Sequence, residues 1–206
     1  MTEFEKQFRE VKELLDFKDY NQVIKRIIDF TLDSEDITLY QKTNAFLDWH
    51  DNNENNEIEK LSQLSNLLNE LHSFLSSKEC HDHQTIISVK NLQKVYNSAF
   101  GLGPINLDIK TGEIIGLVGE NGNGKTTLLR SICGELHPTS GSINYLFQYD
   151  DLYDLRTKLV YIPQRTDTWR GSMYENLEFT ASSYGYKPEE NNLVVNLVIT
   201  RLGLRK

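Results

Sequence analysis

Apolar side chains in the first third of the chain recur at intervals of three and four residues. The positions that show this best are Phe4, Phe8, Val11, Leu15, Val23, Ile24, Ile27 and Ile28. Such spacing places apolar groups on one face of an α-helix, so it predicts two helices, followed by a break at 31–34. A weaker third helix is expected over residues 37–49, with Ser34 as its N-cap residue.

Five leucines at alternating spacings of three and four follow a polar loop at 51–56. They are Leu61, Leu64, Leu68, Leu71 and Leu75, and they make two heptads of an a/d pattern. With the preceding segments they predict a small antiparallel helical bundle over residues 1–78. A sharper interpretation is that this leucine seam docks another protein or serves regulation, and the two interpretations are compatible.

Beyond residue 85 the periodicity becomes that of strands. A helix is expected after the glycine-rich stretch, and strands are expected at 86–89, 105–110, 114–118, 142–147 and 158–162. The segment 114–118 is continuously apolar, as a parallel strand buried on both faces should be. Residues 172–204 look helical in two pieces, interrupted near 185–188. The predicted fold class is α plus α/β: a helical bundle, a linker at 79–85, and a domain with an antiparallel sheet over 86–206.

Composition and charge limit the class of protein. The chain is 38% hydrophobic and has two cysteines, too few for a disulfide framework, which favours the cytoplasm. No apolar stretch approaches the ~20 residues of a membrane-spanning helix. Of the net charge of −8, residues 1–84 carry −9 and residues 85–206 carry +1, which argues against nucleic-acid binding by the first part. Cys80, His81 and His83 in the linker are too few and too crowded for a structural zinc site.

A glycine-rich stretch carries the chemistry of the second part. It fits the pattern G-x-x-x-x-G-K-[ST] of a phosphate-binding loop and comprises Gly119, Glu120, Asn121, Gly122, Asn123, Gly124, Lys125, Thr126 and Thr127. Glycines let successive backbone N–H groups turn toward one anion, and the helix that begins there adds partial positive charge. Lys125 would supply a full charge to the β- and γ-phosphates, and the Thr126 hydroxyl would be a ligand of Mg²⁺.

The residues around this loop resemble the nucleotide-binding domain of ABC (ATP-binding cassette) proteins. The resemblance rests on 111–129, which contains the loop, and on Gly134 followed by 138–143. Two positions depart from the family pattern, since Glu120 stands where proline is common and Asn123 where a small residue is common. Neither side chain would block phosphate binding. The resemblance implies a P-loop NTPase fold that binds ATP with Mg²⁺.

Two further positions match this family. Tyr96 occupies the place of the aromatic residue that stacks on adenine, although a tyrosine packed in the sheet is the simpler alternative. Gln164 matches the glutamine that reaches Mg²⁺ and the attacking water and links the site to a helical subdomain. The resemblance thus implies Lys125 and Gln164 as catalytic residues, and Thr126 and Gln164 as metal ligands. Residues 173–177 look like the start of the helical subdomain.

The resemblance covers about residues 86–204 and stops before three further motifs of the family. These are the signature motif, the Walker B strand that leads to a catalytic glutamate, and the switch histidine. The chain is therefore expected to be the N-terminal part of an ABC-type ATPase that binds ATP but does not turn it over alone. One edge of its parallel sheet would be open, so the C-terminal half is expected to be loosely folded or completed by self-association.

The resemblance implies the ATP-binding subunit of an ABC transporter, which couples ATP hydrolysis to transport through a membrane permease. A second ABC domain, in a homo- or heterodimer, would complete the site, and the subunit would be cytoplasmic or peripheral at the inner membrane. No nucleic-acid partner is expected. Three alternatives stay open: a soluble ABC-like ATPase, another P-loop class, and a regulatory or docking module with an inert cassette. A GTPase would need an Asn-Lys-x-Asp motif to recognise guanine, and the sequence has none. A nucleotide kinase would lack the glutamine loop that Gln164 matches.

Overall fold

The computed structural model describes residues 3–53, 55–78, 84–97, 100–165 and 170–205. The chain forms two compact units, one made of residues 1–79 with 169–206 and the other of residues 80–168. We call the first the helical unit and the second the phosphate-loop unit. In the sequence, the phosphate-loop unit therefore lies between two segments of the helical unit. Cys80, His81 and His83, the weak metal candidates of the linker, lie outside the described residues.

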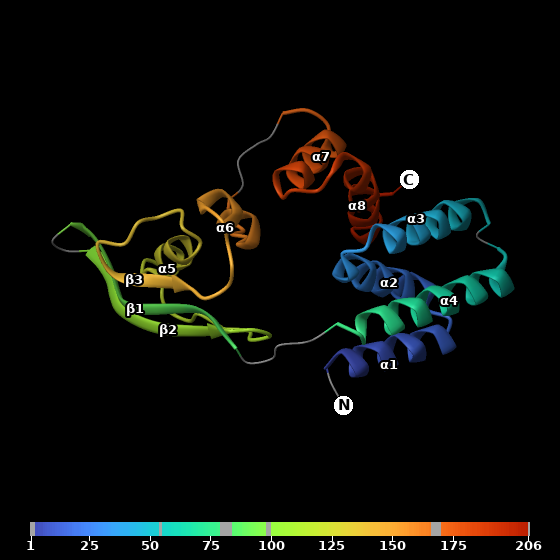
Figure 1. Cartoon of the computed structure of the whole chain (residues 1–206), viewed down its shortest axis with the longest axis horizontal. Coiled ribbons are helices and arrows are strands. Elements are labelled where there is room, and N and C mark those ends of the chain that lie inside the picture. Colours follow the sequence, from blue (N-terminus) through green and yellow to red (C-terminus); the bar gives the residue numbers. More distant parts are fainter. Residues whose placement is uncertain (1–2, 54, 79–83, 98–99, 166–169, 206) are drawn as a thin grey trace. The chain divides into compact units, whose positions relative to one another are not determined.

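Six helices of the described residues build the helical unit (Figure 1). Their bounds are α1 Glu3–Asp16, α2 Tyr20–Ser34, α3 Ile37–Asn52, α4 Glu57–Leu75, α7 Met173–Ser183 and α8 Pro188–Arg201. The first four confirm the predicted N-terminal bundle. The last two confirm the helical tail in two pieces, separated by residues 184–187.

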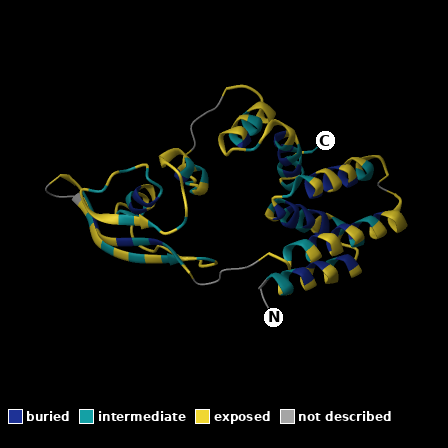
Figure 2. Cartoon of the chain, viewed as in Figure 1, coloured by how far each residue is buried: buried dark blue, intermediate teal, exposed yellow. Residues whose placement is uncertain are grey.

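The core of the helical unit consists of the apolar positions that predicted its helices. Val11, Val23 and Ile28 are completely buried, and the buried face of each helix is visible in Figure 2. A helix satisfies its backbone hydrogen bonds internally, so only its apolar face has to be covered by other elements. The bundle can therefore close its core with contacts between neighbouring helices.

The leucine seam of α4 lies inside this core. Leu64, Leu68 and Leu71 are buried against the other helices, and Leu75 packs at the edge. Leu61, at the N-terminal end of the seam, is partly exposed. The central leucines therefore hold the bundle together and present no surface to another protein.

The predicted break at 31–34 is wrong, because α2 continues through Ser34. The Thr31 hydroxyl donates to the Ile27 carbonyl oxygen at 2.7 Å and lies 2.9 Å from the Thr43 hydroxyl of α3. The polar side chain that suggested a break is thus satisfied within the helix and across to its neighbour.

The N-cap of α3 also differs from the prediction. Asp36 caps the helix, with its carboxylate accepting a hydrogen bond from the Leu39 N–H at 2.9 Å. Ser34 still belongs to α2, which ends when Glu35 adopts a left-handed φ of 53°. Both residue types favour N-caps, and the sharp turn at Glu35 decided between them.

The phosphate-loop unit contains an antiparallel sheet in the order β2-β1-β3. Its elements are β1 Thr85–Asn97, β2 Phe100–Lys110, α5 Lys125–Ile132, β3 Ser140–Tyr145 and α6 Leu152–Lys158. In the register, Val89 of β1 lies opposite Leu107 of β2 and Ile143 of β3. β1, β2 and β3 confirm the strands expected at 86–89, 105–110 and 142–147, although β3 covers 140–145. Leu128 and Ile132 of α5 pack on the same core.

Two other predicted strands do not form in the described structure. Residues 114–118 have no regular secondary structure, and Ile114 and Val118 are 98% and 99% exposed. The expected strand at 158–162 is also absent, and α6 ends at Lys158 instead. A buried parallel strand needs hydrogen-bonding neighbours on both sides, and the three described strands pair only with one another.

The compact units do not follow the predicted domains 1–78, 79–85 and 86–206. Val194 and Leu197 of α8 belong to the core of the N-terminal helices, so the tail packs with the helical unit. The predicted domains follow the order of motifs along the chain, whereas the units follow packing. Because the two divisions answer different questions, the predicted domain boundaries at 78 and 85 stay a prediction.

Candidate functional site

The glycine-rich stretch forms a turn at 121–124 that leads into α5. Gly122 and Gly124 have φ angles of +89° and +79°, which residues with a side chain rarely adopt. A Cβ at Gly124 would also lie 2.7 Å from Cδ1 of Leu102 in β2. The backbone angle therefore favours glycine at this position, and a larger residue would also have to displace the end of the Leu102 side chain.

The N-terminus of α5 coincides with the predicted phosphate site. Lys125 is its first residue, and no side chain caps the helix at Gly124. The ammonium group of Lys125 turns back over the loop and donates to the carbonyl oxygens of Gly119 at 2.5 Å and Glu120 at 2.8 Å. An uncapped helix start and a lysine ammonium over one loop together favour an anion. The uncapped start of α5 and the Lys125 ammonium group therefore fit the binding of a phosphate chain.

Tyr96, predicted from a separate part of the sequence, lies at this loop. Its hydroxyl is 3.3 Å from the hydroxyl of Thr127, and its side chain is half-exposed. The ammonium group of Lys94 lies 5.8 Å from the centre of the Tyr96 ring and donates to the His137 carbonyl oxygen. The structure thus brings an accessible aromatic ring to the phosphate loop, which weakens the alternative of a tyrosine buried in the sheet.

The other predicted site residues are less closely joined. Asn121, Asn123 and Thr126 are exposed on or directly after the loop. Gln164 is exposed beyond α6 and makes no hydrogen bond with any described residue. The structure therefore brings together Tyr96 and the loop, whereas no described hydrogen bond joins Gln164 to the loop. The functional roles of all these residues stay predictions.

Sequence reasoning missed two residues that lie beside the site, Lys94 of β1 and Leu102 of β2. Lys94 and Tyr96 are two residues apart on β1, and residues at that spacing share a face of a strand, so the strand pattern could have placed them together. Leu102 of β2 lies beside Gly124, and no local pattern predicts this because the two residues belong to different elements.

The titration behaviour of the thiol near this helix argues against a role as nucleophile. Burial, followed by the nearby charge of Glu135, raises the pKa of Cys133 at the C-terminal end of α5. A raised pKa keeps the thiol protonated at neutral pH, and the thiolate is the reactive form. Within the described residues, no group of three or more His, Cys, Asp or Glu side chains could hold a metal ion.

Comparison with known proteins decides the family. The family model described as ABC transporter matches residues 102–206, about half of the chain. The chain belongs to the ABC transporter family. The match begins within β2 and includes the phosphate loop, α5 to α8 and β3, whereas α1 to α4 lie outside it. Among the described residues, no helix combines the length and apolar composition that a membrane span requires.

Three relatives are similar to parts of this chain. A protein of Escherichia coli named "Putative phosphonates utilization ATP-binding protein PhnK" is 44% identical over 31% of this chain and 25% of its own length. The multidrug ABC transporter ATP-binding protein YbhF of Escherichia coli is 31% identical over 66% of this chain and 24% of its own length. The sulfate/thiosulfate import ATP-binding protein CysA of Pseudomonas putida is 37% identical over 52% of this chain and 34% of its own length. This ABC family chain therefore spans about a quarter to a third of these relatives.

Proposed function

We propose that the chain is an ATP-binding part of an ABC transporter and that ATP binds at the start of α5. The observation that carries the proposal is the convergence of Lys125, the turn at 121–124 and the accessible ring of Tyr96. Lys125 and the turn were expected to bind a phosphate chain, and Tyr96 was expected to bind an adenine base. Tyr96 lies on β1, whereas Lys125 begins α5. Names of relatives such as YbhF and CysA contain the words ATP-binding protein, which supports the same ligand.

Each residue of the loop has a separate task in this proposal. The Lys125 ammonium leaves the carbonyl oxygens of Gly119 and Glu120 and turns to the β- and γ-phosphates. The Thr126 hydroxyl, exposed at the helix start, would hold Mg²⁺, which offsets the charge of the phosphates when bound. The face of the Tyr96 ring stacks on the adenine base. Lys94 lies beside that ring.

The activity of the whole protein is part of the same proposal. Coupling of ATP hydrolysis to transport would require a membrane permease and a second ABC domain, and the site would lie on the cytoplasmic side. Gln164 would then be carried to the metal and the attacking water by a rearrangement of the segment after α6. We also propose that this chain by itself binds ATP without turning it over, because transfer of the phosphoryl group to water needs further groups that orient the water and complete the metal site.

Equilibrium titration with a fluorescent ATP analogue tests the proposal. Lys125→Met is expected to weaken binding about 10- to 100-fold, because it removes a charged hydrogen-bonding group from the phosphates. Lys110→Met, which removes an exposed lysine at the end of β2, is the matched control and should leave affinity unchanged. If the unmodified chain binds no nucleotide, the alternative of a docking module with an inert cassette replaces the proposal.

A second variant tests the assignment of the base. Tyr96→Ala should weaken binding of ATP about tenfold and leave binding of inorganic triphosphate unchanged, because stacking involves only the base. Equal losses for both ligands would contradict a stacking role and indicate that Tyr96 supports the loop through Thr127. Release of phosphate from ATP by the pure chain, at a rate that depends on Lys125, would contradict the absence of turnover.

A further inference from the structure

The last helix of the chain lies against the N-terminal bundle. Val194 and Leu197 of α8 are buried in the same core as the residues of α2 and α3, with Leu193 and Val198 packed at its edge. These four positions are spaced as the apolar face of a helix. α8 therefore uses one whole face on the bundle, while Asn191 and Val195 of α8 are also buried, within the helical hairpin with α7.

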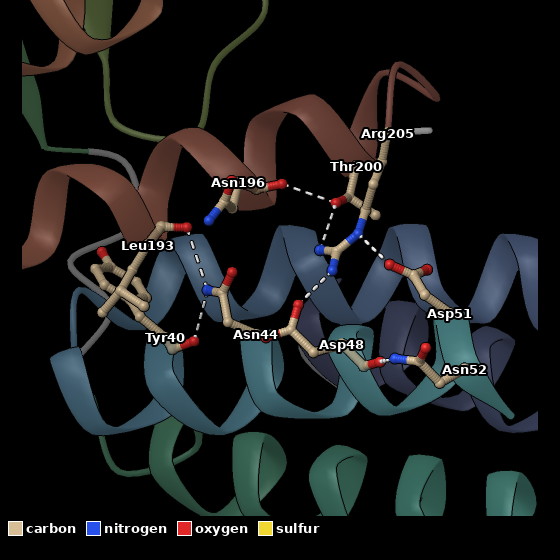
Figure 3. A network of polar contacts seen from close by, with 9 residues as sticks. All are labelled: Tyr40, Asn44, Asp48, Asp51, Asn52, Leu193, Asn196, Thr200 and Arg205. Carbon is tan, nitrogen blue, oxygen red and sulfur yellow. Dashed lines mark hydrogen bonds and ion pairs between the residues drawn. The ribbon is translucent and has the colours of Figure 1, made fainter. Parts of the chain in front are cut away.

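Polar groups fix where α8 lies along the bundle. The buried Asn44 side chain of α3 donates to the Leu193 carbonyl oxygen at 3.2 Å and to the Tyr40 carbonyl oxygen at 2.8 Å (Figure 3). A buried amide that loses one of these partners costs free energy, because water cannot replace it there. Asn44 thus favours one position of α8 over neighbouring ones.

Two arginines after this contact meet three aspartates of the bundle. The Arg201 guanidinium donates to both oxygens of Asp29 in α2, at 2.6 and 3.1 Å. Arg205 donates to Asp48 at 2.5 Å and to Asp51 at 2.6 Å, both in α3, as Figure 3 shows. Two-pronged contacts between a guanidinium and a carboxylate are geometrically selective. They also explain part of the acidic character of residues 1–84, since three of those carboxylates face arginines.

The two sides of this interface have different relations to the family. α8 lies within residues 102–206 that match the ABC transporter model, and α2 and α3 lie outside them. We propose that the N-terminal bundle is an intrachain docking domain that binds α8 of the cassette and selects it by the pairing of Asp29, Asp48 and Asp51 with Arg201 and Arg205. The docked bundle covers the Leu193, Val194, Leu197 and Val198 face of α8, so no other partner can use that face while the bundle is bound.

This proposal does not depend on nucleotide binding. It assigns the bundle a partner within the chain, whereas the leucine seam suggested a partner outside it. The phosphate-loop unit is joined to the bundle through the chain before residue 84 and again through docked α8, so undocking would leave it joined at one end only.

Hydrogen exchange of the full chain, read by mass spectrometry on peptides of α8, tests the docking. Arg201→Glu places two carboxylates together and should raise the exchange of α8 about tenfold or more. The exchanged pair Arg201→Glu with Asp29→Lys should bring protection back toward that of the unmodified chain. Arg9→Glu makes the same charge change at an exposed position of α1 and should leave α8 unchanged.

The outcomes separate the proposal from its rivals. Unchanged exchange in Arg201→Glu, or an equal increase in Arg9→Glu, would overturn docking by charge. Should Arg201→Glu also loosen α1 to α4, recovery in the exchanged pair supports the proposal and lack of recovery overturns it. Protection of α8 that falls on dilution of the unmodified chain would show that a second copy supplies the helix, and the intrachain assignment would be wrong.

Discussion

The two units treat their apolar residues in opposite ways. In the helical unit most residues of the predicted apolar faces are buried, including Val11, Val23 and Leu64. In the phosphate-loop unit the most apolar segment of the chain, 114–118, ends in the exposed side chains Ile114 and Val118. A helix needs only a cover for one face, whereas a central strand needs backbone partners on both sides. An apolar segment of this chain is therefore buried only where the described elements include the neighbours that cover it or pair with it.

The largest expected effect tests this contrast directly. Leu71→Ala, in the core of the helical unit, should lower the free energy of unfolding by about 2–5 kcal/mol, because it leaves a cavity that neighbours fill only in part. Val118→Ala should change stability by less than about 0.5 kcal/mol, since its side chain is exposed. Native-state hydrogen exchange measures both, on α2 for the first variant and on β1 for the second.

Leu92→Ala is the control within the phosphate-loop unit, because Leu92 is buried in β1 and should behave like Leu71. A loss for Val118→Ala as large as that for Leu92→Ala would show that segment 114–118 is buried in solution. The difference between the two units would then disappear.

A smaller effect is expected for the hydrogen bond between Thr31 of α2 and Thr43 of α3, at the position where a helix break was predicted. Thr31→Val leaves the buried Thr43 hydroxyl without its partner 2.9 Å away, and should cost about 1–3 kcal/mol. The double variant with Thr43→Val should cost less than the sum of the two single variants, because no hydroxyl is then left alone. Urea unfolding followed by circular dichroism gives the three values.

Ser73→Ala is the matched control for this pair. Its hydroxyl donates to the carbonyl oxygen four residues earlier, as that of Thr31 does, but it is exposed to solvent. The expected change is less than about 0.5 kcal/mol. Additive losses in the Thr31 and Thr43 double variant would mean that the two hydroxyls do not interact.

The smallest expected effect is a pH dependence at the start of α7. The Ser172 backbone N–H and hydroxyl donate to the Glu175 carboxylate at 2.8 and 2.9 Å and lower the pKa of Glu175. A lowered pKa in the folded state means that the ionised carboxylate stabilises the helix above its unfolded pKa of about 4.3 and loses that effect as the pH falls further. Exchange of α7 amides, corrected for intrinsic rates, should therefore increase below about pH 4.

Glu175→Gln keeps the shape of this side chain and removes its titration. The variant should exchange faster than the unmodified chain at pH 6 and about equally at pH 3. A difference that persists unchanged at pH 3 would show that the charge of Glu175 does not support the helix.

Much of the fold follows from local pattern. The spacing of apolar residues placed α1 to α4, α7 and α8, and alternation placed β1, β2 and β3. The errors arose where the deciding contact lies outside the local segment. Thr31 looked like a helix break until its hydroxyl met Thr43, and segment 114–118 looked like a strand although no described strand pairs with it.

The candidate site divides in the same way. Gly122, Gly124 and Lys125 could be recognised from their spacing, because a phosphate loop is built from consecutive backbone groups. The family resemblance implied that Tyr96 stacks on adenine, but neither its contact with Thr127 nor the position of Leu102 beside Gly124 was anticipated. Both result from packing between segments far apart in the sequence, and the spacing of residues along the chain does not predict such packing.

The amino-acid order by itself determined α1 to α5, α7 and α8, the three paired strands, the glycine-rich turn and the acidic character of the first 84 residues, whereas α6 was not expected from it. Those properties depend on neighbours a few positions away, whose hydrogen bonds and side-chain spacing are set by local geometry. Tertiary structure alone decided that α8 belongs with the N-terminal helices and that Asp29 meets Arg201. These contacts join residues far apart in the sequence, and only the folded chain can choose one such pairing among many.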